Sequence, residues 1–171
     1  YQEQLDGTYE LVDTDNLSGT TGASVIASPK TYAGFTFDET ITGTVDNGTI
    51  LRDGSLVLKL YYTLNTDTVY KVEHHLEQDD KSYKLHETET LAGTTGATVN
   101  AIEKTYDGYE FDKTVKETIS SGTVDGDGTL VLKLYYNKEL ELTITTTPVH
   151  SNPSLAGGVN AVNTADDTDL G

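Results

Sequence analysis

The four histidines, His74, His75, His86 and His150, are the side chains best suited to acid–base chemistry or metal binding near neutral pH. His74 and His75 are adjacent in a segment of alternating apolar residues, so their rings should point to opposite faces of a strand. No Ser/His/Asp spacing, nucleotide-binding glycine loop or nucleophile elbow accompanies them. We interpret them as surface residues of strands. The sequence predicts a protein that is not an enzyme, with no catalytic residues and no cofactor.

The acidic run at residues 125–128, Asp-Gly-Asp-Gly, has oxygen ligands of the kind that calcium prefers. It lacks the later bidentate glutamate of an EF-hand loop, and Asp-Gly is also the strongest short signal for a tight hairpin turn. The chain contains no cysteine, so it has no thiolate ligands. The turn interpretation is favoured, and no metal site is predicted.

Tyrosine is the commonest aromatic residue, with 11 copies against 3 phenylalanines and no tryptophan. Two Tyr-Tyr pairs stand at residues 61–62 and 135–136, where alternation sends one ring of each pair inward and the other outward. Amphipathic rings at a surface are common in ligand-binding sites. Tyr61 and Tyr135, the outward members, are therefore the candidate ligand-facing residues.

Both tyrosine pairs close a strand that occurs twice. Residues 56–62 read Leu-Val-Leu-Lys-Leu-Tyr-Tyr, and residues 130–136 read the same. At period two the leucines and the second tyrosine share one face, which is the pattern of a half-buried strand. An Asp-Gly turn signal stands just before each copy, at residues 53–54 and 127–128. Each copy is predicted to be the last strand of a folded unit.

The two strands belong to a longer repeat with an offset of 74 residues (130 − 56). Half or so of the overlapping positions are identical, without insertions. This period exceeds the ~20–50 residues of most solenoid units, so each copy is expected to bury its own small core. The predicted organisation is repeat 1 at residues 1–66, repeat 2 at residues 67–139, and a C-terminal strand with a linker or tail at residues 140–171.

Composition sets the expected fold class. Threonine and tyrosine are abundant and hydrophobic residues make up only 35%, as in β-rich domains whose strands are largely exposed. A third strand of each repeat is expected over residues 40–45 and 114–119. Residues 23–32 and 97–106 fit either a short helix or an irregular crossover. The predicted fold class is mostly β, α+β at most, in two tandem repeat domains.

One strand distinguishes the two repeats. Repeat 2 opens with residues 68–75, in which alternating Tyr70, Val72 and His74 predict a strand. At the offset of 74, its counterpart would precede Tyr1, so repeat 1 lacks most of its first strand. Residues 140–147 alternate in the same way and have no repeat behind them.

A spare strand and an incomplete sheet together predict strand exchange between copies. Unpaired strand edges template the addition of another strand. A head-to-tail contact that does not close builds a fibre. The partner would be a second copy of the chain, and the protein a self-assembling filament subunit. The predicted strand-exchange interface consists of Leu140, Leu142, Ile144 and Thr146.

Charge and hydropathy narrow the range of partners. The net charge of −17 argues against nucleic acid, which needs a basic surface, and against an anionic membrane surface. It is typical of a protein that stays soluble and unaggregated. No apolar run approaches the ~20 residues that span a bilayer, so no membrane insertion is predicted. Because the chain begins at Tyr1, we expect a processed product or a fragment.

Four segments of repeat 2 carry a family resemblance: residues 70–74, 91–96, 106–109 and 128–136. Together they resemble the MucBP-like and Listeria–Bacteroides-type repeats of Gram-positive surface proteins, and the resemblance covers about residues 1–140. It implies small β-grasp-like domains in tandem between an exported head and a wall anchor, and hence an extracellular structural or adhesive protein of the cell surface. Some relatives bind mucin or glycans, so host glycans or mucin are implied partners. No Leu-Pro-x-Thr-Gly sorting motif is present, so wall anchorage is not carried over.

Overall fold

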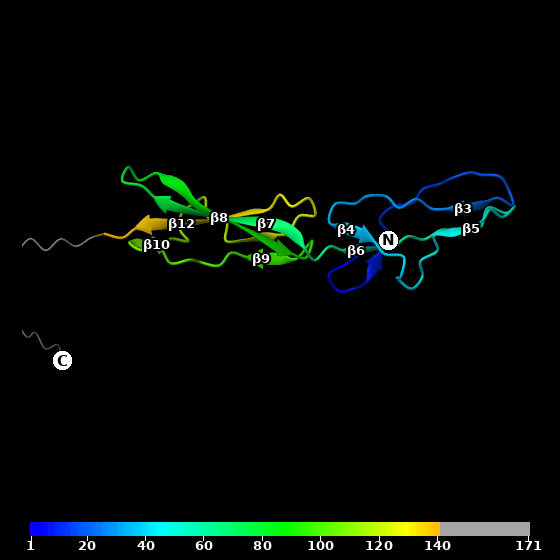
Figure 1. The fold of residues 1–171 in the computed structure, drawn as a ribbon, viewed down its shortest axis with the longest axis horizontal. Coiled ribbons are helices and arrows are strands. Elements are labelled where there is room, and N and C mark those ends of the chain that lie inside the picture. The colour runs from blue at the N-terminus through cyan, green and yellow to red at the C-terminus, as the bar shows by residue number, and fades with distance from the viewer. Residues whose placement is uncertain (141–171) are drawn as a thin grey trace, which may run out of the picture. The chain divides into compact units, whose positions relative to one another are not determined.

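The computed structural model describes residues 1–140, and all regular structure within this range is β (Figure 1). Repeat 1 contains β1 (Gln2–Glu3), β2 (Tyr9–Glu10), β3 (Ser24–Ile26), β4 (Phe35–Phe37), β5 (Asn47–Thr49) and β6 (Tyr62–Leu64). Repeat 2 contains β7 (Thr68–Glu77), β8 (Tyr83–Gly93), β9 (Thr98–Asn100), β10 (Tyr109–Phe111), β11 (Ser121–Thr123) and β12 (Val131–Lys138). The prediction of a mostly β chain in two tandem repeat units is confirmed; the β-grasp assignment stays a prediction.

The main sheet of repeat 2 has the strand order β10-β12-β7-β8. The first strand of the repeat, β7, lies between the last strand, β12, and the long strand β8. It pairs in parallel with β12, from Val131 opposite Lys71 to Tyr136 opposite Leu76, and antiparallel with β8. β7 and β12 are thus the two inner strands of this sheet, and the alternating sequence of β7 puts every second side chain on one face.

The core of repeat 2 lies on that face of β7 and β12. Val72, Leu132, Leu134 and Tyr136 are all fully buried there. Side chains from the short strands and loops cover them, namely Val99, Ala101, Tyr106, Tyr109, Phe111, Val124 and Leu130. The predicted inward face of residues 130–136 is therefore confirmed in this repeat.

Repeat 1 has a smaller sheet, with the order β2-β1-β6-β4. Its first strand, β1, is two residues long, and only Gln2 pairs with β6, in parallel and opposite Tyr62. The strand predicted over residues 56–62 is reduced to a single bridge between Lys59 and Val45 before β6 begins. Tyr62 is the one large apolar side chain of residues 1–66 that is buried.

The predicted third strand is wrong in both repeats, because residues 40–43 and 114–117 form turns. An aspartate starts each turn: the Thr40 amide and hydroxyl both donate to Asp38 Oδ1, and Thr114 does the same to Asp112 Oδ1. Such local side-chain bonds compete with strand pairing.

The two segments left open between helix and crossover each contain a short strand. β3 pairs with β5, and β9 pairs with β11, both antiparallel. The Asp-Gly turns before the last strands are confirmed by the positive φ of Gly54 (71°) and Gly128 (74°). The strands around these turns pair little with each other. In repeat 2, β11 pairs with β9, and the bridge between Ile119 and Lys133 joins the segment before β11 to β12.

The two repeats meet in residues 1–139, which form one compact unit. The Asn65 amide donates to the Gly34 carbonyl (2.9 Å), and the Thr95 amide donates to the Asn65 carbonyl (2.9 Å). Gly34 approaches Gly126 so closely that a Cβ on either residue would collide with the other's backbone. In the described part of the chain, no helix has the length and apolar character to cross a membrane.

Candidate functional site

A polar network surrounds His74, on the core face of β7. The His74 ring is fully buried, with Nδ1 3.0 Å from the Tyr136 hydroxyl and Nε2 3.1 Å from Glu89 Oε2. The Tyr136 oxygen already accepts from the Lys104 amide (3.0 Å), so its proton is available to Nδ1, and Nε2–H then donates to Glu89. A neutral ring is fully satisfied in this arrangement. The interpretation of His74 as a surface residue is therefore wrong.

A lysine closes the network on the solvent side. Lys104 Nζ lies 2.7 Å from Glu87 Oε1 and 2.9 Å from Glu89 Oε1, and the Tyr106 hydroxyl donates to Glu87 (2.9 Å). Hydrogen bonds from Lys104 hold the pKa of both carboxyls below the usual range, and burial raises the pKa of Tyr106. Each polar group has a structural partner. The network therefore ties β8 to the loop before β10.

Repeat 1 contains the same network without the histidine. Lys30 Nζ lies 2.7 Å from Asp13 and 2.8 Å from Asp15, and the Tyr32 hydroxyl donates to Asp13 (3.0 Å). The Lys30 amide donates to the Tyr62 hydroxyl (2.8 Å). Because the same contacts recur on a weaker core, we infer that they are part of the repeat's architecture.

The outward tyrosines, predicted to face a ligand, lie in clusters of aromatic rings. Tyr135 is 8% exposed, stacked on His75 (ring centroids 4.8 Å apart) with the edge of Tyr83 at 5.0 Å. Tyr61 is half-buried, stacked on Tyr1 at 4.8 Å with Tyr9 at 5.2 Å. Contact of either ring with a ligand stays a prediction.

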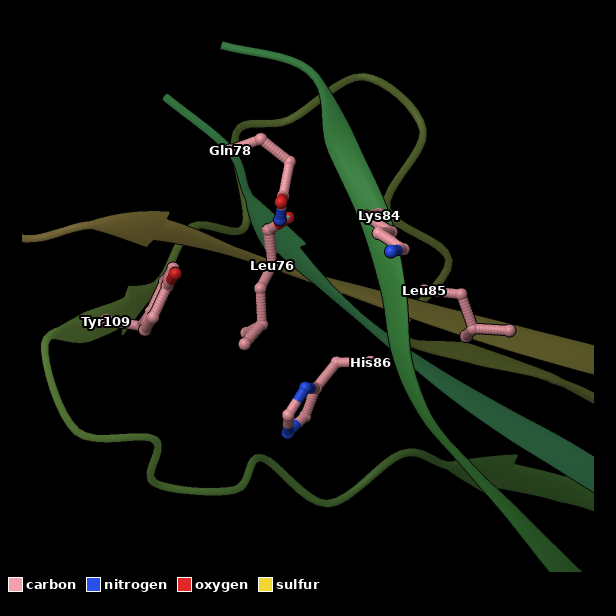
Figure 2. Close-up of a pocket in the computed structure, with 6 residues that line it drawn as sticks. All are labelled: Leu76, Gln78, Lys84, Leu85, His86 and Tyr109. Atoms are coloured by element: carbon pink, nitrogen blue, oxygen red, sulfur yellow. Dashed lines mark hydrogen bonds between the residues drawn. The ribbon is translucent and has the colours of Figure 1, made fainter. Parts of the chain in front are cut away.

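A surface depression lies at the end of the sheet in repeat 2, with a volume of about 460 Å³. Its lining consists of Leu76, Gln78, Lys84, Leu85, His86 and Tyr109. Figure 2 shows the His86 ring and the Leu76 side chain reaching into the same space, with Tyr109 at its side. This combination of an apolar floor, two flat rings and several hydrogen-bonding groups suits a small polar ligand. No local sequence pattern predicts this depression, because its lining residues come from β7, β8, β10 and the turn after β7.

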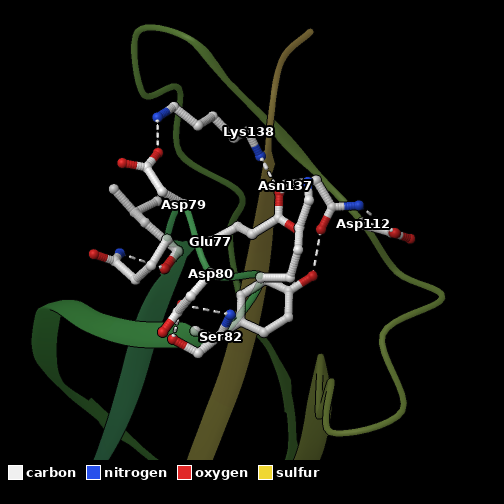
Figure 3. Close-up of polar contacts among 11 residues, drawn as sticks. Glu77, Asp79, Asp80, Ser82, Asp112, Asn137 and Lys138 are labelled. Carbon is white, nitrogen blue, oxygen red and sulfur yellow. Dashed lines mark hydrogen bonds and ion pairs between the residues drawn. The ribbon is translucent and has the colours of Figure 1, made fainter.

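Polar contacts tie the β7–β8 turn to the end of β12 (Figure 3). Glu77 accepts from the Lys138 amide (3.1 Å), and Lys138 Nζ pairs with Asp79 (2.5 Å). The Tyr83 hydroxyl bonds to Asn137, whose Nδ2 donates to Asp112 (2.7 Å). These contacts fasten the exit of β12 to the sheet.

The acidic turn at residues 125–128 forms with Asp127 Oδ1 accepting from the Thr129 amide (3.1 Å) and hydroxyl (2.7 Å). In residues 1–140, no group of three or more His, Asp or Glu side chains is arranged to hold a metal ion. The Asp127 carboxylate is therefore engaged in the turn itself.

The open part of repeat 1 lies where β7 stands in repeat 2. The flanking segments, residues 11–18 and 56–60, have no strand pairing toward each other, and their side chains Leu11, Val12 and Val57 are 58%, 48% and 63% exposed. Of the predicted interface residues, Leu140 is 92% exposed, and Leu142, Ile144 and Thr146 lie outside the described residues.

The ion pairs of the two networks join residues 15 or 17 positions apart, and no local pattern predicts them. The repeat itself carries a signal: an acidic residue at positions 13 and 87 accompanies a lysine at positions 30 and 104, although Asp replaces Glu. Retention of charge between two copies that differ elsewhere indicates a contact.

A comparison with protein families finds a match in both repeats. The MucBP domain family model matches residues 1–69 and again residues 71–137. Neither the curated proteins nor the solved structures compared with this chain give a significant match. The two matched segments together cover most of the chain.

Proposed function

This chain belongs to the MucBP domain family, and from that membership we propose that it is a non-catalytic structural and adhesive repeat protein of the bacterial cell surface, located outside the cell. MucBP domains occur in surface proteins and are a non-catalytic repeat family. The polar networks support this, because their carboxylates, lysines and histidine bond one another.

Parallel pairing of the first and last strands carries the proposal. The chain enters repeat 2 at β7 and leaves it at β12, and six residue pairs join these strands in parallel. Tension on the two ends would pull β7 and β12 in opposite directions along their length. The hydrogen bonds between them would then be sheared together, instead of opening one at a time. Such a repeat resists extension, as a surface spacer under flow must.

Single-molecule stretching between the chain ends tests this proposal. Repeat 2 should unfold at a clearly higher force than repeat 1, where β1 and β6 share only one pair. In repeat 2, Lys71→Pro removes the amide that donates to the Leu130 carbonyl (3.0 Å), while Lys71→Ala keeps it. The proline variant should unfold at lower force and the alanine variant should not. Equal unfolding forces for the two repeats would contradict the mechanical function.

Glycan or mucin binding is a second candidate, favoured by the depression shown in Figure 2. Its exposed ring, His86, offers a flat surface, and Lys84 offers a charged donor. On a glycan array, His86→Ala should abolish any signal, whereas Val12→Ala, at the matching position of repeat 1, should leave it unchanged. Loss of the signal only in Tyr61→Ala or Tyr135→Ala would move the site to the ring clusters.

Self-assembly into a filament is a third candidate, favoured by the unpaired segments of repeat 1. Light scattering and negative-stain microscopy of the purified chain should then show polymers whose length increases with concentration. A chain that stays monomeric at all concentrations would contradict it.

A further inference from the structure

We infer that Gly126 is a specificity-determining residue of the joint between the two repeats. It gives repeat 2 a surface on which the glycine turn of a preceding repeat, residues 33–34, docks in one fixed orientation. The surface consists of Thr95 and Gly126, from two turns that the hydrogen bond from the Gly96 amide to the Val124 carbonyl (2.9 Å) holds together. This inference concerns the joint between repeats, so it stands apart from the candidate functions above.

The contact at this surface is backbone against backbone. A Cβ on Gly126 would lie 2.4 Å from the Ala33 carbonyl oxygen and 2.9 Å from the Gly34 nitrogen. Cβ atoms in folded proteins do not come this close to other heavy atoms, and backbone atoms cannot rotate away as a side chain can. Repeat 1 can therefore sit in this position only if residue 126 has no side chain.

Hydrogen bonds fix the segment that connects the repeats, residues 65–67. The Asn65 amide donates to the Gly34 carbonyl in repeat 1, and the Asn65 carbonyl accepts from the Thr95 amide in repeat 2, both at 2.9 Å. The Thr95 hydroxyl is buried and lies 2.7 Å from the Thr68 hydroxyl. Because Asn65 is bonded on both sides, the docked turn and the connecting segment form one joint.

The turn that contains Gly126 does not itself require glycine at that position. The left-handed conformation in residues 125–128 belongs to Gly128, with a φ of 74°, whereas the φ of Gly126 lies outside that region. Outside the left-handed region, a residue with a side chain can adopt the same backbone. The contact with repeat 1 is thus the feature that requires glycine at position 126.

Repeat 1 contains the same turn with a large side chain in it. Residues 51–54 are closed by the Gly54 amide, which donates to the Leu51 carbonyl (3.1 Å), as the Gly128 amide donates to the Asp125 carbonyl (2.9 Å). Arg52 occupies the position of Gly126 (126 − 52 = 74). A side chain at this position is therefore compatible with the fold of a repeat.

The turn that docks, in contrast, is the same in both repeats. Gly34 and Gly108 have φ of 80° and 75°, and the Glu139 amide donates to the Gly108 carbonyl (2.9 Å) as Asn65 does to Gly34. The docking turn is thus a constant part of the repeat, while the surface that receives it varies. A repeat with glycine at the position of residue 126 accepts a repeat in front of it in this orientation, and one with a larger residue does not.

Spin labels placed on the two repeats test this inference, because the chain has no cysteine of its own. Glu39→Cys and Lys113→Cys put one label on each repeat, at matched exposed positions. Double electron–electron resonance on the labelled chain should give one narrow distance peak. Adding Gly126→Arg should abolish the narrow peak and give a broad distribution. Asp125→Arg puts the same side chain on the neighbouring exposed residue, and it should keep the narrow peak.

A proline variant tests the same joint through its hydrogen bond. Thr95→Pro removes the amide that donates to Asn65, at the second position of a turn closed by the Ala97 amide and the Thr94 carbonyl (3.0 Å). Proline is favoured at this turn position, so the turn should still form. The variant should also broaden the distance distribution. Thr21→Pro, in the matching turn of repeat 1, should leave it narrow.

Hydrogen exchange shows whether repeat 2 remains folded in Gly126→Arg. Protection of β7 and β12 should be unchanged, since Arg52 occupies the same turn in repeat 1. Loss of this protection would overturn the inference, because the turn itself would then need glycine. A narrow peak retained in Gly126→Arg, or a broad distribution in the labelled chain before any further change, would overturn it as well. Equal broadening in Asp125→Arg would overturn the assignment to Gly126.

Discussion

Residues 56–62 of repeat 1 and 130–136 of repeat 2 are identical, yet only repeat 2 has a buried core. Leu134 and Tyr136 are 0% exposed, whereas Leu60, the counterpart of Leu134, stays partly exposed and Tyr62 alone is buried. The difference lies in β7, which has ten residues where β1 has two. Identical strand residues thus become core only when a neighbouring strand covers them.

Contacts made by the end of the first strand, which both repeats contain, are the same in both repeats. Each has a stacked ring pair, Tyr61 on Tyr1 and Tyr135 on His75, at 4.8 Å. In each repeat, a glutamate of the first strand also accepts a hydrogen bond from a backbone amide of the last strand. Glu3 accepts from the Leu64 amide (2.9 Å), and Glu77 accepts from the Lys138 amide (3.1 Å). The residues at the end of the first strand therefore make the same contacts whether that strand has ten residues or two.

The largest difference should come from truncating the matched leucines. Leu134→Ala empties a fully buried position and should cost about 2–5 kcal/mol in the free energy of unfolding. Leu60→Ala removes a side chain that solvent already reaches, so about 1 kcal/mol is expected. Urea unfolding, with amide hydrogen exchange to assign the loss to a repeat, measures both. Equal costs would mean that repeat 1 is as well packed as repeat 2.

Alanine substitutions at two matched glycines, Gly34 and Gly108, test the contact between the repeats. Gly34 and Gly108 occupy the same turn with φ of 80° and 75°, so alanine should cost about 1–2 kcal/mol at either through backbone strain. A Cβ on Gly34 would also lie 2.6 Å from Gly126 Cα and 2.6 Å from Thr95 Cγ2, whereas Gly108 has open space. Gly34→Ala should therefore cost roughly 1–3 kcal/mol more than Gly108→Ala in thermal unfolding. Identical melting curves would contradict a close junction.

The matched tyrosines should differ in what their hydroxyls support. Tyr136→Phe leaves buried His74 Nδ1 without its partner, at a cost of about 1–3 kcal/mol. Tyr62→Phe leaves only the amide of exposed Lys30, which water reaches, so about 1 kcal/mol or less is expected. Chemical denaturation compares them, and His74→Phe combined with Tyr136→Phe should recover part of the loss. A Tyr62→Phe variant less stable than Tyr136→Phe would place the more demanding network in repeat 1.

The smallest expected difference between the repeats is the pH at which each begins to lose stability in acid. Lys104 lowers the pKa of Glu87 and Glu89 from an ordinary value of 4.5, and Lys30 lowers that of Asp13 from 3.8. The stability from a lowered carboxyl pKa is complete above the ordinary value and is lost as the pH falls through the folded value. Repeat 2 should therefore begin to lose this contribution at higher pH than repeat 1. In Lys104→Met, hydrogen-exchange protection of β8 should depend less on pH below about 4.5. An unchanged dependence would mean that the ion pair contributes nothing.

Sequence patterns predicted some elements better than others. The period-two face of residues 130–136 and the positive φ of Gly54 and Gly128 were readable, because alternation and Asp-Gly turns are local properties. The strand expected at residues 114–119 does not form, because the Thr114 amide and hydroxyl donate hydrogen bonds to Asp112 and the chain turns there. The depression at Leu76, His86 and Tyr109 was invisible, since three separate strands bring these residues together.

By itself, the sequence determined the duplication, the strand-rich character and the inward face of the last strand, because each is written in residues close together or in self-similarity at an offset of 74. Only the tertiary structure decided that β7 inserts between β12 and β8, that His74 is buried, and that the outward rings Tyr61 and Tyr135 stack on neighbours. The physical reason is that strand order and burial depend on which distant segment supplies the next hydrogen-bonded neighbour. Identical local sequences therefore have different environments in the two repeats.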